Sequence, residues 1–242
     1  FAQRRRRNRG QFIPALISLN IRFLNREYAM NLGDLTPAPE LYGFCLALHL
    51  LGLLLAFLTA PWRQLLTHLE RQSALGLAIA TLPLLWSMSP GLPGGVGFQL
   101  LGMTTVTLIF GWQLAVIAGT IAGLVMLIVG TWPAEALPVN LALVVLVPVV
   151  VTMAVLAMAN LLRRTNLFVY MLGVGFFGSM LALMASLWVG TLILDPQLDH
   201  ALVLLLTFPE GFLNGALISA LTVFYPDIVK TYDDIRYLGK RP

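Results

Sequence analysis

Seven apolar runs, separated by polar or Gly- and Pro-rich breaks, limit what this chain can fold into. They cover residues 41–60, 74–90, 98–110, 113–130, 140–161, 167–194 and 201–225. A helix needs about 20 apolar residues to cross a bilayer, and these runs lack the strict alternation of a membrane β-barrel. The sequence therefore predicts an all-α, polytopic membrane protein, folded as a single bundle of about seven transmembrane helices.

The overall composition excludes a water-soluble fold. Hydrophobic residues make up 58% of the chain and charged residues 11%, against about 45–50% and about 25% in soluble domains. The third run is short, and Gly111-Trp112 separates it from the fourth. This break predicts either a tight helical hairpin or a single kinked helix.

The basic residues predict the orientation of the bundle. With seven spans, one side receives eight Lys and Arg residues and the other side, from Met30 onward, receives none. The eight are Arg63, Arg71, Arg163, Arg164, Lys230, Arg236, Lys240 and Arg241. Because cytoplasmic loops carry the excess of Lys and Arg, we expect the C-terminus in the cytoplasm and Met30 outside, in a cell (plasma or inner) membrane.

The first 29 residues do not fit this pattern, since their seven arginines would lie outside. They also lack the uninterrupted apolar core of a signal peptide. We therefore interpret 1–29 as a basic extension upstream of a natural start at Met30. The remaining chain divides into a transmembrane domain over 30–226 and a cytoplasmic tail over 227–242.

Two stretches on the predicted cytoplasmic side are amphipathic, one over 62–69 and one over 225–235. Their apolar residues recur with helical spacing, which is typical of helices that lie on the membrane surface. Docking of a partner subunit is the alternative interpretation.

Several classes of function are excluded by what the full sequence lacks. The single Cys45 excludes an intrachain disulfide and a cysteine cluster for a metal. The chain has no Walker A motif and no G-x-S-x-G or H-E-x-x-H signature. Basic residues are confined to the N-terminus and the breaks between runs, so we expect no nucleic-acid partner. No cofactor is predicted.

Polar side chains inside the apolar runs are the candidate binding residues, because such groups normally face the bundle interior or a wet cavity. His49 lies near the middle of the first run, Gln99 follows a Gly- and Pro-rich loop over 89–97, and Asn140 begins the fifth run. Each has a structural alternative. For His49 it is a hydrogen bond to a neighbouring helix, and for Gln99 and Asn140 it is helix capping or interhelical bonding.

Glu210 is the charged candidate, with Asn214 one helical turn later. It lies about ten residues into the last run, directly after Pro209. A carboxylate at this depth needs a partner or a cation, and irregular backbone there borders a cavity or buried protein. A functional role and a helix–helix contact both stay open for Glu210.

Three stretches carry a resemblance to a known family. They are 95–102 (GVGFQLLG) with 109–112 (IFGW), 137–140 (LPVN) followed by 147–149 (VPV), and 209–213 (PEGFL). On these stretches the chain resembles the CbiM-like membrane proteins, which capture cobalt or nickel for energy-coupling-factor (ECF) ABC importers.

The resemblance implies a seven-helix substrate-binding subunit that has no ATPase activity of its own. It also implies a transmembrane coupling protein and cytoplasmic ATPases as partners, and a transition metal or other small solute as cargo. The family binds its metal with an N-terminal Met-His and a histidine near the glycine-rich loop. Here Met30 is followed by Asn31, and Gln99 stands near that loop, so the metal ligands stay unknown.

Two functions of other classes remain as alternatives. One is an intramembrane enzyme in which His49 and Glu210 act as acid and base. The other is a structural membrane subunit without a substrate.

Overall fold

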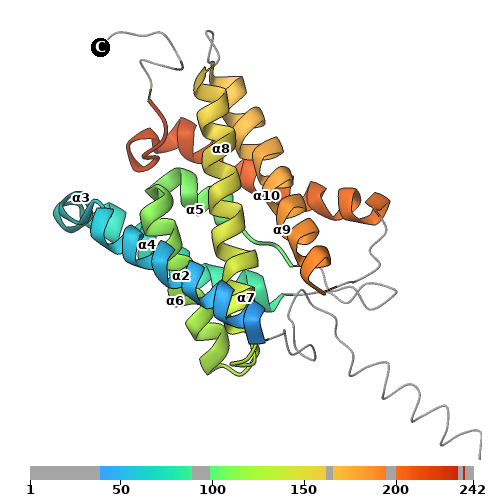
Figure 1. Cartoon of the computed structure of the whole chain (residues 1–242). Coiled ribbons are helices and arrows are strands. Elements are labelled where there is room, and N and C mark those ends of the chain that lie inside the picture. Colours follow the sequence, from blue (N-terminus) through green and yellow to red (C-terminus); the bar gives the residue numbers. More distant parts are fainter. Residues whose placement is uncertain (1–38, 89–98, 162–165, 195–199, 234–236, 238–242) are drawn as a thin grey trace, which may run out of the picture.

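The computed structural model describes residues 39–88, 99–161, 166–194, 200–233 and 237 (Figure 1). Its α-helices are α2 (Pro39–Thr59), α3 (Trp62–Thr67), α4 (Leu69–Ser87), α5 (Met103–Phe110), α6 (Trp112–Ile128), α7 (Leu137–Leu141), α8 (Val147–Leu161), α9 (Gly178–Leu194) and α10 (His200–Phe224). Two π-helical segments, η1 (Ala142–Leu146) and η2 (Val169–Phe177), lead into α8 and α9, and a 3-10 turn, η3 (Pro226–Ile228), follows α10. The predictions for 1–29, for Met30-Asn31 and for the loop over 89–97 fall outside the described residues.

The predicted all-α class is confirmed over these ranges, which contain no strand. Four of their helical segments are long and apolar enough to cross a membrane: Pro39–Thr59, Leu137–Leu161, Val169–Gly190 and Leu204–Phe224. α6 is apolar but shorter. The membrane class is thus supported by length and composition, while the number of complete spans stays a prediction.

The predicted third span, 98–110, is helical only over the eight residues of α5, so the helix alone is too short to cross a bilayer. At 1.5 Å per residue it is about 12 Å long, against about 30 Å of hydrocarbon. All eight side chains are buried, so the helix lies inside the protein. Irregular chain at its ends is tolerated there because it does not meet lipid.

α5 and α6 form a tight helical hairpin, the first of the two alternatives for the break at Gly111. Gly111 has φ +85°, a conformation that glycine adopts without a Cβ clash. A Cβ added to Gly119 would lie 3.1 Å from Met103 Cε, so the start of α5 lies beside the middle of α6. The two helices are antiparallel neighbours.

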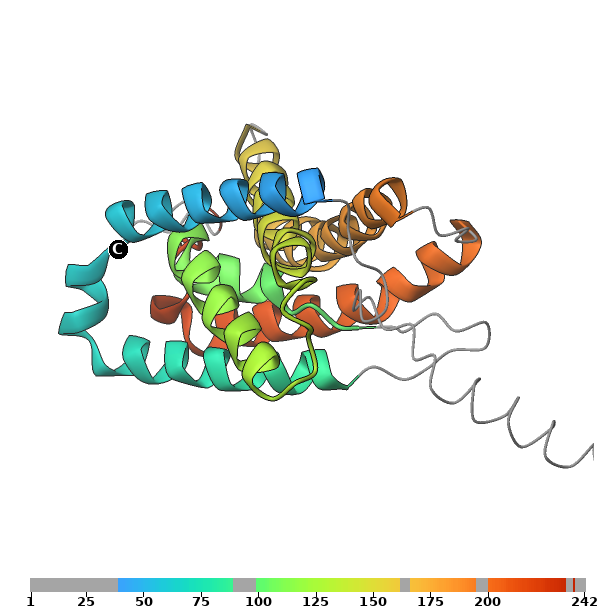
Figure 2. The same ribbon diagram turned by 60° about the horizontal axis from the view of Figure 1, so that its bottom comes forward.

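The other helices surround this hairpin. Figure 2 shows α2 and α4 on opposite sides of α6, joined at one end by α3. α8, α9 and α10 pack together on the other side of α5 (Figure 1). α2 buries only Cys45, His49 and Ala56, which leaves most of its apolar surface for lipid.

The two predicted amphipathic helices have different outcomes. Residues 62–67 form α3, which buries Leu65 and exposes Leu66. The second prediction is wrong over the described residues 225–233, where only the 3-10 turn occurs. The N–H groups of Lys230 and Thr231 instead donate to the oxygens of Ile109 and Leu108, at 2.9 and 3.2 Å. The chain leaves the helical path because these last carbonyls of α5 need donors.

Candidate functional site

The carboxylate of Glu210 binds the start of α5. It is 1% exposed, and its Oε2 and Oε1 accept the N–H groups of Leu101 and Gly102 at 2.8 and 2.9 Å. The Asn214 amide donates to Oε1 at 2.8 Å. Three N–H groups therefore supply the partners that a carboxylate needs at this depth. An anion is also favourable beside the positive end of a helix.

Asn214 extends the same contact by one helical turn. Its Oδ1 accepts the main-chain N–H of Thr105 at 2.9 Å and the Thr105 hydroxyl at 2.7 Å. Residues four apart lie on one face of a helix, so Glu210 and Asn214 together accept three N–H groups at the start of α5, two from the residues just before the helix and one from its first turn. This contact corresponds to the helix–helix alternative for Glu210.

Gln99 lies two residues before this contact. Its side chain is wholly buried, and neither Oε1 nor Nε2 has a hydrogen-bond partner in the described part of the chain. The adjoining chain is held firmly, since Leu101 donates to Glu210 and its oxygen accepts Trp86 Nε1 at 3.1 Å. Gln99 is thus held beside the start of α5 with its amide unpartnered.

A stacked tryptophan pair covers the same end of the hairpin. Trp86 and Trp132 have ring centroids 5.3 Å apart and planes 9° apart. Trp132 Nε1 has no acceptor among the described residues. A Cβ on Gly123 would lie 3.1 Å from the Trp132 ring and would overlap Leu141, which places α7 against α6 beside this pair.

Asn140 precedes Leu141 in α7 and is 0% exposed. Its Oδ1 and Nδ2 also lack partners in the described ranges. Residues 137–161 continue from α7 through η1 into α8, and π-helical turns often mark functional sites. The interhelical bonding proposed as the alternative for Asn140 and Gln99 is absent from the residues that the structure describes.

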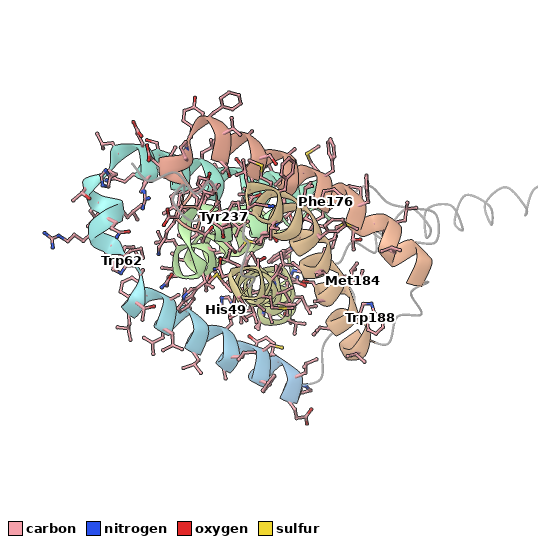
Figure 3. All side chains as sticks on the ribbon, turned by 90° about the horizontal axis from the view of Figure 1, so that it is seen from above. His49, Trp62, Phe176, Met184, Trp188 and Tyr237 are labelled. Atoms are coloured by element: carbon pink, nitrogen blue, oxygen red, sulfur yellow. The ribbon has the colours of Figure 1, made fainter. Side chains whose placement is uncertain are left out.

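His49 belongs to a different contact, on the side of α2 that faces the bundle (Figure 3). Its Nε2 is 3.0 Å from Thr120 Oγ1, and that hydroxyl donates to the oxygen of Val116 at 2.7 Å. Because the hydroxyl proton is used on Val116, Nε2 must donate to Thr120. Nδ1 then carries a lone pair, with no donor within the described chain.

The five predicted residues thus fall into distinct contacts. Glu210 and Asn214 bind each other, Gln99 lies beside them through Leu101, and Asn140 lies near the tryptophan pair through Leu141. His49 and Glu210 bond to different partners, so no acid–base pair is formed by a direct bond. The described residues contain no group of three His, Cys, Asp or Glu side chains that could hold a metal ion.

Sequence reasoning missed the partners of these residues. Thr105, Thr120, Trp86 and Trp132 make or border the contacts, although each side chain alone resembles ordinary core packing. The sequence contained one signal for them, a cluster of three threonines at 104–107 in the short third run. Hydroxyl groups inside an apolar run favour contact with protein over contact with lipid.

The chain matches no protein-family model, no curated protein and no solved structure. The geometry of the buried polar groups, together with the sequence pattern, is therefore the basis for a function.

Proposed function

We propose that this protein is the substrate-binding subunit of an energy-coupling-factor type ABC importer. The observation that carries the proposal is the pair of buried amides, Gln99 and Asn140. Their four side-chain polar atoms have no partner in the described residues. A buried polar group left without a partner costs about 1–3 kcal/mol, and a polar solute bound between the helices would offset that cost.

The cargo follows from the resemblance, which implies cobalt or nickel. Neutral amide oxygens are weaker ligands for these ions than imidazole. A capture site that uses Gln99 in place of a histidine is therefore expected to bind them weakly. Glu210 and Asn214 act as positioning residues in this proposal, because their bonds hold the start of α5 next to Gln99.

Partner subunits supply the energy for transport. The sequence has no Walker A motif, so a transmembrane coupling protein and cytoplasmic ATPases drive reorientation of the loaded subunit. The apolar faces of α2 and α3, where Leu58 and Leu66 are about 70% exposed, are available to lipid and to such a coupling protein.

The proposed topology has seven membrane-embedded helical segments, with Met30 outside and the C-terminus in the cytoplasm. The chain's only cysteine, Cys45, is buried, which makes orientation simple to test. In a Cys45→Ala background, Thr67→Cys on α3 should react in intact cells only after the membrane is made permeable. Reaction of this residue from outside would reverse the proposed orientation.

Calorimetric titration of the purified full chain with cobalt and nickel chloride tests the capture site. Gln99→Leu and Asn140→Leu should each weaken metal binding at least tenfold while keeping or raising the thermal unfolding temperature, since each removes unpartnered polar atoms. Gln99→His should strengthen binding, because it adds an imidazole to the site.

Gln113→Leu is the matched control, because Gln113 is an amide in the first turn of α6, beside Gly111 at the opposite end of the hairpin, and its change should leave metal binding unchanged. If neither ion binds the wild-type chain and Gln99→His adds no affinity, the metal cargo is wrong. Lower thermal stability in both leucine variants would instead assign the two amides a structural role.

A further inference from the structure

A second polar feature lies at the opposite end of the α5–α6 hairpin, around Gly111. The segment after α10 folds back onto this end, where Lys230 and Thr231 bond to the last carbonyls of α5. This is the end that the distribution of Lys and Arg predicts to be cytoplasmic. These residues take no part in the proposed capture site.

Two cationic side chains meet here from different parts of the chain. The Arg71 guanidinium of α4 donates to the main-chain oxygen of Asp227 at 3.0 Å. The Lys230 ammonium lies against Gly111, where an added Cβ would be 3.0 Å from Nζ. Burial, together with the positive charge of Arg71, lowers the pKa of Lys230 below its ordinary value. The two like charges are close enough to repel each other.

Neither cation is neutralised within the described part of the chain. Arg71 bonds to a main-chain oxygen, and no ion pair with a carboxylate is formed by Arg71 or Lys230 there. Main-chain bonds on both sides hold the two segments in place despite the repulsion. An arrangement of this kind is favourable for an external anion.

A small recess adjoins the two cations. It is shallow and partly open, with a cavity volume of about 10 Å³, which is room for about one water molecule. Its lining includes Gln64, Leu65, Arg71, Ile109, Phe110 and Leu114. None of these is acidic. Lys230 does not line the recess, but its main-chain N–H donates to Ile109, which does. A phosphate group is too large for the recess itself, so an anion would lie at its mouth, beside the two cations.

The surroundings indicate that this anion comes from the membrane. Trp62 begins α3 and Trp112 begins α6, and tryptophans are enriched at the level of lipid headgroups. Leu66 of α3 and Leu69 at the start of α4, which are close in sequence to the lining residues Leu65 and Arg71, are 70% and 77% exposed. They offer an apolar surface for an acyl chain next to the cations. Basic pockets between helices on the cytoplasmic side are known to bind anionic lipid headgroups.

We propose that Arg71 and Lys230 bind the phosphate of an anionic phospholipid headgroup at the mouth of this recess. Arg71 contributes a planar pair of donors suited to phosphate oxygens, and Lys230 contributes a second charge from the returning segment. The lipid then joins α4 to the chain that follows α10.

Native mass spectrometry of the full chain tests this site, with phosphatidylglycerol and phosphatidylcholine of identical acyl chains added in neutral detergent. The wild-type chain should retain phosphatidylglycerol preferentially. The double variant Arg71→Gln and Lys230→Gln should reduce that retention by roughly tenfold to thirtyfold and leave phosphatidylcholine unchanged. Arg71→Lys should lose less than Arg71→Gln, because it keeps the charge.

Arg63→Gln is the matched control, since Arg63 is an exposed cation of α3 that does not line the recess. An equal effect of Arg63→Gln would overturn the site in favour of general charge attraction. Competition by inorganic phosphate at the same concentration as the lipid would identify the ligand as free phosphate. Unchanged lipid retention in the double variant, with loss of a co-purifying protein, would make this a protein-docking surface. If the double variant unfolds, the comparison of Arg71→Lys with Arg71→Gln decides the outcome.

Discussion

Asn214 donates its amide to both the main-chain oxygen and the carboxylate of Glu210, one helical turn earlier, at 2.8 Å each. The same side chain accepts two bonds from Thr105. α10 therefore reaches the start of α5 through two adjacent side chains that support each other. A change in either one is expected to disturb the position of Gln99.

Glu210→Gln should destabilise the protein, although the new side chain has nearly the same shape. A carboxylate accepts with both oxygens, whereas an amide would direct its NH2 group at an N–H of Leu101 or Gly102. A buried donor left without an acceptor costs about 1–3 kcal/mol. Thermal unfolding in detergent measures the loss. Glu40→Gln, the same change on the exposed first turn of α2, should have no effect, and equal unfolding temperatures for the two variants would contradict the prediction.

Thr120→Val should destabilise the contact between α2 and α6, because it removes the only acceptor that His49 Nε2 has among the described residues. The expected loss is about 1–3 kcal/mol. His49→Leu in the same background should add little further loss, since the two groups form one bond.

Thr81→Val is the matched control for that pair. Thr81 also donates its hydroxyl to a carbonyl four residues earlier, at 2.7 Å, but on an exposed surface without a histidine. Additive losses for His49→Leu and Thr120→Val would show that the observed contact contributes nothing to stability.

Gly119→Ala should destabilise the packing of α6 against η1. The added Cβ would lie 2.7 Å from Val145, and overpacking of this kind costs about 1–3 kcal/mol. Gly76→Ala on α4 should do the opposite. Nothing lies within 4 Å of its added Cβ, and alanine is the better helix former by about 1 kcal/mol. If Gly119→Ala and Gly76→Ala shift the unfolding temperature in the same direction, the close packing at Gly119 is contradicted.

The stability contribution of Lys230 should depend on pH. Partial burial and the charge of Arg71 on α4 lower its pKa from 10.5, and the other polar groups near it are Asp227 in its own turn and Gln113 on α6. Below the lowered pKa, Lys230 is charged in both the folded and the unfolded protein. Its burial and its repulsion by Arg71 then destabilise the folded protein to their full extent. As pH rises towards 10.5, the folded protein releases the Lys230 proton before the unfolded protein does, so this destabilisation declines.

Lys230→Gln is therefore expected to be more stable than the wild type at neutral pH, with a difference that shrinks towards pH 10.5. Thermal unfolding of both chains across this pH range measures the difference. A constant difference would show that the charge of Lys230 plays no part. Added phosphatidylglycerol should also reduce the difference at neutral pH, because a bound phosphate compensates the charge.

Particular residues show how far sequence reasoning reaches for this chain. The helical class and the break at Gly111 were predictable, since apolar runs and glycine act locally along the chain. Gly119 and Gly123 have the G-x-x-x-G spacing that lets helices pack closely, and the structure places both against neighbouring side chains. The partners of Glu210 were not predictable, because Leu101 and Gly102 contribute main-chain groups from more than 100 residues away.

The predicted helix over 225–235 failed for a related reason. Its apolar spacing suits a helix, but the segment instead provides N–H groups to α5. The segment bonds to carbonyls at the end of α5, a helix far away in the sequence. Its own apolar spacing does not indicate that contact. For the candidate site, the sequence indicates which side chains are polar. Whether each of them has a hydrogen-bond partner depends on tertiary contacts.

Both ends of α5 are bonded to residues that lie far towards the C-terminus: Glu210 and Asn214 at its start, Lys230 and Thr231 at its end. During synthesis, α5 leaves the ribosome at least 100 residues before those partners do. The native position of the short helix can therefore be completed only after the last segment has entered the membrane and folded back. The bonds that fix both ends of α5 are therefore formed late, after the helices that follow it in the sequence have been synthesised.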